Sequence, residues 1–127
     1  VAIWNSLAQS TNPDYQVRRE SPGINEYYVN LWTDPHPPTT GEVELSAQLT
    51  TIIGSEIGVN TLAFDITPPG GGEPTTLETA YTNDGPNDGG IHVAEATFDQ
   101  PGTWQVAVRY NPGGPELVDE FDIEVSE

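Results

Sequence analysis

The feature that most constrains this chain is the regular alternation of apolar and polar residues between Gly89 and Tyr110. Alternation at period two is typical of a half-buried strand. Between the two alternating runs, Pro101 presets φ for a turn, and Gly102 tolerates the positive φ that a type II turn needs next. The stretch therefore predicts a hairpin with buried aromatic residues beside its turn. The same-face positions are His92, Ala94, Ala96 and Phe98, then Trp104, Val106, Val108 and Tyr110.

The same alternation recurs along the rest of the chain, separated by segments rich in glycine and proline. Strands are expected at residues 27–32, 42–50, 59–67 and 75–82 and around Phe121 to Val125, with turns or loops between them. A chain of 127 residues forms one domain with a real core and needs no disulfide. Seven or eight short strands without a helix predict an all-β fold, an antiparallel immunoglobulin-like β-sandwich.

Residues 1–25 are expected to be an N-terminal arm or linker, and residues 26–127 the sandwich domain. Within the arm, Tyr15 to Arg18 also fits a short edge strand that pairs with the domain or, by β-augmentation, with a neighbour. The chain begins with valine, so we expect it to start inside a longer gene product whose signal peptide or anchor lay upstream.

The charge is strongly acidic, with 20 acidic residues against three arginines and a net charge of −17. Such a surface disfavours nucleic acid and an anionic membrane surface as partners of this domain. It fits either solubility at high salt or attraction of cations. Two acidic stripes, Glu42/Glu44 and Glu120/Asp122/Glu124, face outward. If their strands were neighbours, like charges would oppose each other, and added salt or divalent cations would stabilise the fold.

Three segments resemble those of a known group of domains: Asp34 to Gly41 ahead of a strand, Gly90 to Ala94, and Pro101 to Val106. Over about residues 26–126 the chain resembles the YtkA-like and FixH-like group of immunoglobulin-fold extracytoplasmic domains. The resemblance implies a β-sandwich tethered outside the cytoplasmic membrane. Several members of the group occur alongside copper handling or terminal oxidase assembly, so it also implies a possible copper site.

A copper site would depend on His36 and His92, because the chain has no methionine and no cysteine for Cu(I). Two imidazoles with a carboxylate such as Asp34 or Asp88 would suit Cu(II) or zinc. The structural alternative makes His92 a histidine at the edge of the core and His36 a solvated loop residue.

A calcium site is a second metal hypothesis, based on the loop from Asn83 to Gly90. Asp84, Asn87 and Asp88 supply oxygen ligands among glycines, although the spacing is not that of an EF-hand. Turn formation explains the same residues equally well.

Tyr15, Val17, Tyr28 and Trp32 are the candidate interaction residues. Tyr28 and Trp32 would be an exposed aromatic pair, and a platform for a sugar, only if the opposite face of their strand is the core. Tyr15 and Val17 would take part if their strand pairs with a partner.

No arrangement for nucleophilic catalysis is present, since the chain lacks cysteine and a Gly-x-Ser-x-Gly motif. We therefore predict a non-enzymatic extracytoplasmic binding or assembly module, attached upstream of this segment, whose partner is a protein or another copy of itself. One alternative is a self-assembling subunit of a surface layer or filament that uses the arm for strand pairing. The other is a copper-handling accessory domain.

Overall fold

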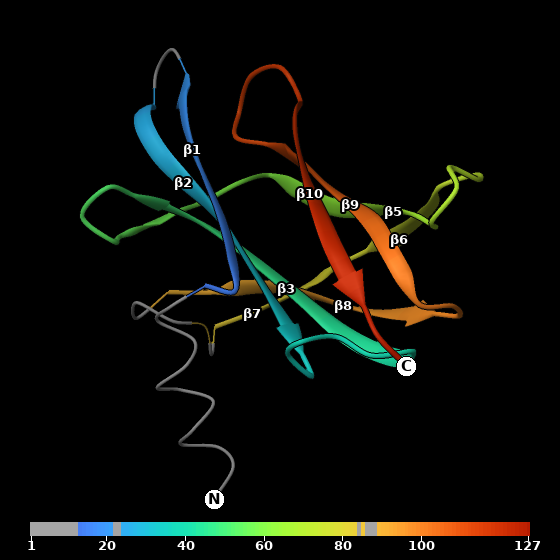
Figure 1. The fold of residues 1–127 in the computed structure, drawn as a ribbon. Helices are drawn as coiled ribbons and strands as arrows, with labels where there is room; N and C mark the ends of the chain where they lie inside the picture. The colour runs from blue at the N-terminus through green and yellow to red at the C-terminus, as the bar shows by residue number, and fades with distance from the viewer. Residues whose placement is uncertain (1–12, 22–23, 84, 86–88) are drawn as a thin grey trace, which may run out of the picture.

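Every regular element in the described part of the chain is a β-strand (Figure 1). The computed structural model describes residues 13–21, 24–83, 85 and 89–127. Within these residues, no helix is long and apolar enough to cross a membrane. The strands are β1 (Tyr15–Ser21), β2 (Asn25–Asp34), β3 (Gly41–Thr51), β4 (Glu56–Ile57), β5 (Thr61–Thr67), β6 (Thr75–Glu78), β7 (Ala80–Thr82), β8 (Ile91–Phe98), β9 (Gly102–Asn111) and β10 (Leu117–Val125).

The strands form two antiparallel sheets that face each other (Figure 1). Sheet A has the order β1-β2-β3-β8-β7, with β4 paired to β3 as well, and sheet C has the order β10-β9-β5-β6. The predicted all-β antiparallel sandwich is therefore confirmed. The described residues form ten strands rather than seven or eight, because two short strands, β4 and β7, were not expected.

The core lies between the sheets and is built from the alternate positions that the sequence pattern indicates. Val43, Leu45, Ala47 and Leu49 of β3 all point inward and are at most 2% exposed. Their partners from sheet C include Phe64, Val106, Val108 and Ile123, which are completely buried. Burial of a full aliphatic side chain contributes about 1.5–3 kcal/mol, so this layer is the main source of stability.

The predicted hairpin between β8 and β9 is wrong, although both strands exist. β8 pairs with β3 and β7 in sheet A, whereas β9 pairs with β10 and β5 in sheet C. The segment between them crosses from one sheet to the other, so Phe98 and Trp104 meet across the core with ring centroids 4.8 Å apart. Alternation specifies one buried face for each strand, but it does not specify which strand lies beside it. Gly102 does adopt a positive φ, of 129°.

A second crossing divides the single strand expected at residues 75–82. β6 pairs with β5 in sheet C, and β7 pairs with β8 in sheet A. Thr79 lies at the break, where its hydroxyl donates a hydrogen bond to the carbonyl oxygen of Leu62 (2.7 Å). The remaining unexpected strand, β4, has only two residues, which is too short to show alternation.

Tyr15–Ser21, from the segment expected as an arm or linker, forms the edge strand β1. It pairs with β2 along its whole length, from Tyr15 opposite Leu31 to Ser21 opposite Asn25. The edge strand within the chain's own sheet was one of the two alternatives for this segment. Residues 1–12 of the expected arm lie outside the described residues.

The two acidic stripes do not oppose each other, because β3 belongs to sheet A and β10 to sheet C. Glu44 has other acidic neighbours instead. It lies directly opposite Asp34 of β2 on one side and Glu95 of β8 on the other. Partial burial and these two carboxylates raise the pKa of Glu44 above its usual value.

Candidate functional site

A pocket of about 250 Å³ opens on the outer face of sheet A, across β1, β2, β3 and the turn that follows β3. Every residue that lines it is uncharged, although the chain as a whole has a net charge of −17. The lining residues are Pro13, Gln16, Tyr28, Asn30, Trp32, Thr50, Thr51, Ile52, Ile53 and Gly54.

The position of the pocket follows from strand register. Asn30 lies opposite Gln16 on one side and Gln48 on the other, so polar side chains meet in a row across three strands. Tyr27, Val29 and Leu31 occupy the intervening positions of β2 and face the core, being at most 1% exposed. The face of β2 that points away from the core therefore lines the pocket.

The floor of the pocket is a hydrogen-bonded network centred on Asn30, which is only 3% exposed. Its Oδ1 accepts from Gln16 Nε2 (2.8 Å), and its Nδ2 donates to Thr50 Oγ1 (3.0 Å) and to the carbonyl oxygen of Gln48 (3.2 Å). A buried amide whose partners are fixed in this way holds its neighbours in one orientation. The network thus gives the pocket a defined polar floor.

Trp32 contributes to the wall of the pocket and is 8% exposed. Its indole Nε1 is buried and has no hydrogen-bond partner among the described residues. By contrast, Nε1 of Trp104 donates to the carbonyl oxygen of Gln100 at 2.9 Å. Buried polar groups are nearly always paired, so this indole N–H is an exception among the described residues.

The rim of the pocket carries two exposed aliphatic side chains, Ile52 (51% exposed) and Ile53 (85% exposed). The turn that holds them is fixed by backbone hydrogen bonds from Gly54 N to Thr51 O (2.9 Å) and from Thr51 N to Ser55 O (2.8 Å). Gly54 adopts φ of 95°, which favours glycine. The two isoleucines are therefore presented by an ordered turn.

Of the four predicted interaction residues, the structure brings Tyr28 and Trp32 together in this pocket. The opposite face of β2 is indeed the core, but Trp32 is only 8% exposed, so the expected exposed aromatic pair is wrong for Trp32. Tyr15 and Val17 lie on the other side of sheet A, partly buried against the core cluster. Tyr15 makes edge contacts with His36 and Phe121, and burial raises its pKa.

The two histidines have separate surroundings. His36 follows β2, and its Nδ1 lies 2.9 Å from Thr33 Oγ1 and 3.7 Å from Asp14 Oδ2. His92 lies on β8, on the far side of β3, with its ring centroid 4.8 Å from that of Tyr81. Burial lowers the pKa of His92.

The metal hypotheses stay predictions. The described residues contain no group of three or more His, Asp or Glu side chains arranged to hold a metal ion. Asp34, which was considered as a carboxylate ligand for copper or zinc, lies opposite Glu44 in the pairing of β2 with β3. Asp84, Asn87 and Asp88, the residues proposed for calcium and, in one case, for copper, lie outside the described residues.

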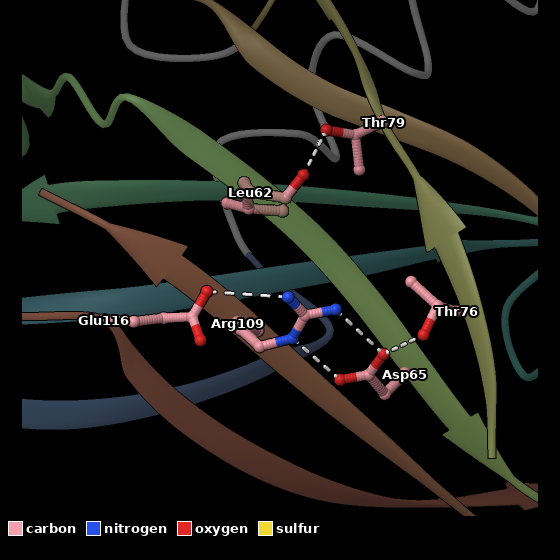
Figure 2. Close-up of polar contacts among 6 residues, drawn as sticks. All are labelled: Leu62, Asp65, Thr76, Thr79, Arg109 and Glu116. Carbon is pink, nitrogen blue, oxygen red and sulfur yellow. Dashed lines mark hydrogen bonds and ion pairs between the residues drawn. The ribbon is translucent and has the colours of Figure 1, made fainter.

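All three arginines pair with acidic side chains. Figure 2 shows Arg109 on the outer face of sheet C, where its Nε and Nη2 contact the two oxygens of Asp65 at 3.0 and 3.2 Å. Thr76 also donates to Asp65 (2.6 Å), and Glu116 lies 3.5 Å from Nη1. The pairing with Arg109 lowers the pKa of Asp65. This cluster links β9 with β5 and β6, and its polar groups satisfy one another.

Sequence reasoning missed most of the pocket, including Gln16, Asn30, Thr50 and the two isoleucines. One signal was available, since Ile52 and Ile53 stand side by side immediately before Gly54 in a segment predicted to be a turn. Adjacent apolar residues in a turn have no strand face on which to be buried. The polar residues gave no such signal, because Asn, Gln and Thr on an outer face are ordinary in a strand.

The geometry defines an antiparallel β-sandwich domain with an uncharged pocket on one outer face. No family model matches the chain. No curated protein matches it either. The resemblance to the YtkA-like and FixH-like group is therefore not confirmed at the level of the family.

Solved structures share the fold at low sequence identity. A DUF4426 family protein from Pseudomonas aeruginosa PAO1 has a TM-score of 0.56 at 10% identity, over 87% of this chain and 94% of that chain. A DUF4785 family protein from Legionella pneumophila subsp. pneumophila str. Philadelphia 1 has a TM-score of 0.53 at 16% identity, over 79% of this chain and 29% of that chain. FetP from uropathogenic E. coli strain F11 has a TM-score of 0.41 at 14% identity, over 87% and 97% of the two chains, a likeness too remote to bear on this chain. The first two likenesses support the sandwich fold alone.

Proposed function

We propose that this chain is a non-enzymatic binding module that acts outside the cytoplasm. It binds a protein partner through the outer face of sheet A. The observation that carries the proposal is Ile53, which is 85% exposed on a hydrogen-bonded turn at the rim of an uncharged pocket. The extracytoplasmic setting is supported by the resemblance of residues 26–126 to domains found there.

Apolar surface is left in contact with water at the rim of the pocket. Single exposed aliphatic residues are ordinary on protein surfaces, but here two adjacent isoleucines border a pocket. Burial of an isoleucine side chain is worth about 1.5–3 kcal/mol, and a partner that covers the rim gains this contribution. The fixed turn reduces the entropy that binding would otherwise cost.

The polar clusters of the described residues support a binding role over a catalytic one. Asp65 with Arg109 and Asp119 with Arg19 are ion pairs in which each charge already has its partner. A catalytic acid or base needs a proton position that faces a substrate. Neither pair lines the pocket.

Site-specific photo-crosslinking tests the proposal. A photoreactive residue at position 53 is compared with one at position 118, because Val118 is also exposed (45%) but lies on β10 of the other sheet. In envelope extracts of the source organism, we expect a discrete crosslinked protein from position 53 only. A product of two copies of this chain would identify self-assembly. Equal labelling from both positions, or none from position 53, would contradict the proposal.

A further inference from the structure

We infer that the pocket on sheet A accepts a neutral peptide segment of the partner, with one apolar side chain against Tyr28 and the isoleucine rim. The backbone amides of that segment pair with the amide and hydroxyl side chains of the pocket. This inference rests on the proposed function, and it specifies the chemistry of the segment that is bound.

Charge selects against an ionised ligand in this pocket. No lining residue carries a charge, so a cationic side chain meets no carboxylate and an anionic one meets no arginine. The net charge of −17 repels an anion and attracts a cation at long range, but that attraction does not remove the cost of desolvating the cation inside an uncharged pocket. Moving a charge out of water without a partner is costly, whereas a neutral side chain bears no such penalty.

The hydrogen-bond inventory favours a ligand that supplies acceptors. Thr50 Oγ1 accepts from Asn30, which leaves its hydroxyl hydrogen available to donate. The indole N–H of Trp32 is a donor without a partner among the described residues. A donor without an acceptor is unfavourable, so a ligand oxygen that pairs with such a donor gains affinity. Carbonyl oxygens of an extended peptide are such acceptors.

The rim decides between a peptide and a saccharide, since both are neutral and rich in acceptors. A saccharide would use the two rings and the amides, but its hydroxyl groups gain little from the aliphatic surface of Ile52 and Ile53. An apolar side chain gains from both the rings and the rim. The lining combines apolar groups with a few fixed polar groups. It therefore matches an apolar side chain of a peptide together with the backbone amides on either side of it.

Nuclear magnetic resonance titration of the full chain, labelled with ¹⁵N, tests the inference through the tryptophan indole signals. The probes are acetyl-Ala-X-Ala-amide with X as leucine, glutamate or lysine, together with methyl β-glucopyranoside. We expect the leucine peptide to shift the indole signal of Trp32 saturably and to leave that of Trp104 unchanged, because Trp104 Nε1 is already bonded to Gln100 O. The two charged peptides should bind about tenfold more weakly, because each must desolvate a charge that has no partner in the pocket.

Ile53→Ser provides the variant, because a side chain that is 85% exposed can be replaced without disturbing the core. It should raise the Kd of the leucine peptide about fivefold. This factor corresponds to part of the free energy gained by burying one aliphatic side chain. Val118→Ser is the matched control and should leave the Kd unchanged. A Trp32 signal that does not respond to the leucine peptide, or that responds equally to the charged peptides or only to the glucoside, would overturn the inference. The crosslink from position 53 would still stand in those cases, so the two proposals fail separately.

Discussion

Arg19 of β1 and Asp119 of β10 form an ion pair that joins the two sheets, with Arg19 Nε 2.9 Å from Asp119 Oδ1. The Asp119 side chain is only 4% exposed, whereas that of Arg19 is 44% exposed. The second oxygen of Asp119 accepts from the Tyr110 hydroxyl (2.7 Å), which lies 2.8 Å from the hydroxyl of Tyr27. These linked polar contacts connect the edge strand β1 to the rest of the sandwich.

Arg19→Ala should destabilise the fold by about 2 kcal/mol, less than the loss of a fully buried pair because Arg19 is 44% exposed. Removal of one partner leaves a buried carboxylate without its cation, although Asp119 keeps the hydroxyl of Tyr110. Arg18→Ala is the matched control, because Arg18 pairs with Glu26 at the surface, where both side chains are more than 40% exposed. The control should cost less than about 1 kcal/mol. Urea unfolding measures both, and equal losses would contradict the view that Arg19 anchors β1.

Tyr110→Phe should cost about 1–3 kcal/mol, because it removes the donor to Asp119 and leaves the buried hydroxyl of Tyr27 without its partner. Burial and the bond to Asp119 also raise the pKa of Tyr110 well above its usual value. Tyr81→Phe removes a hydroxyl bonded to Glu56 (2.8 Å) from a ring that is 52% exposed. Thermal unfolding should show a clearly larger loss for Tyr110→Phe, and a reversed order would refute this account of the buried network.

The sequence was sufficient to predict which residues face the core, because alternation depends only on the geometry of one strand. β3 illustrates this, with Val43, Leu45, Ala47 and Leu49 buried as predicted. The pairing of strands was not predictable in the same way. Phe98 and Trp104 flank a short connection that fits a hairpin as well as it fits a crossing between sheets, and only the surrounding strands distinguish the two.

The pocket was predictable only in part. The alternation of β2 grouped Tyr28 with Trp32 on one face, and the structure shows that this face points away from the core. Gln16 and Thr50 reach the same pocket from β1 and β3, so their contribution depends on register between strands. Register of that kind is set by contacts across the sheet, and a single sequence does not display them. The separate positions of His36 and His92 depend on topology for the same reason.

Arg109→Lys should destabilise the protein by about 1 kcal/mol at pH 7, because lysine keeps the charge but cannot form two parallel bonds to Asp65. Pairing lowers the folded-state pKa of Asp65, so its stabilising effect is present above the unfolded value of about 3.9 and is lost as pH falls through the folded value. The difference between wild type and variant should therefore shrink from pH 7 to pH 2. Urea unfolding across this range checks it, with Arg18→Lys as a control that should change little at any pH. A difference that is constant with pH would show that Asp65 is not the partner that matters.

Glu44→Gln should stabilise the protein at pH 7 by about 0.5–1 kcal/mol, because it removes a partly desolvated charge that Asp34 and Glu95 also repel across the sheet. The folded-state pKa of Glu44 is raised, so its unfavourable contribution is absent below the unfolded value of about 4.3 and develops as pH rises through the folded value. The gain from Glu44→Gln should accordingly vanish below about pH 4, and 1 M NaCl should reduce it at pH 7 while raising the Tm of the wild type. Glu42→Gln is the control, since Glu42 lies opposite Thr97 rather than another acid, and its effect should be smaller. If Glu44→Gln lowers the Tm, or if its gain does not depend on pH and salt, then repulsion along this row of carboxylates does not limit the stability of sheet A.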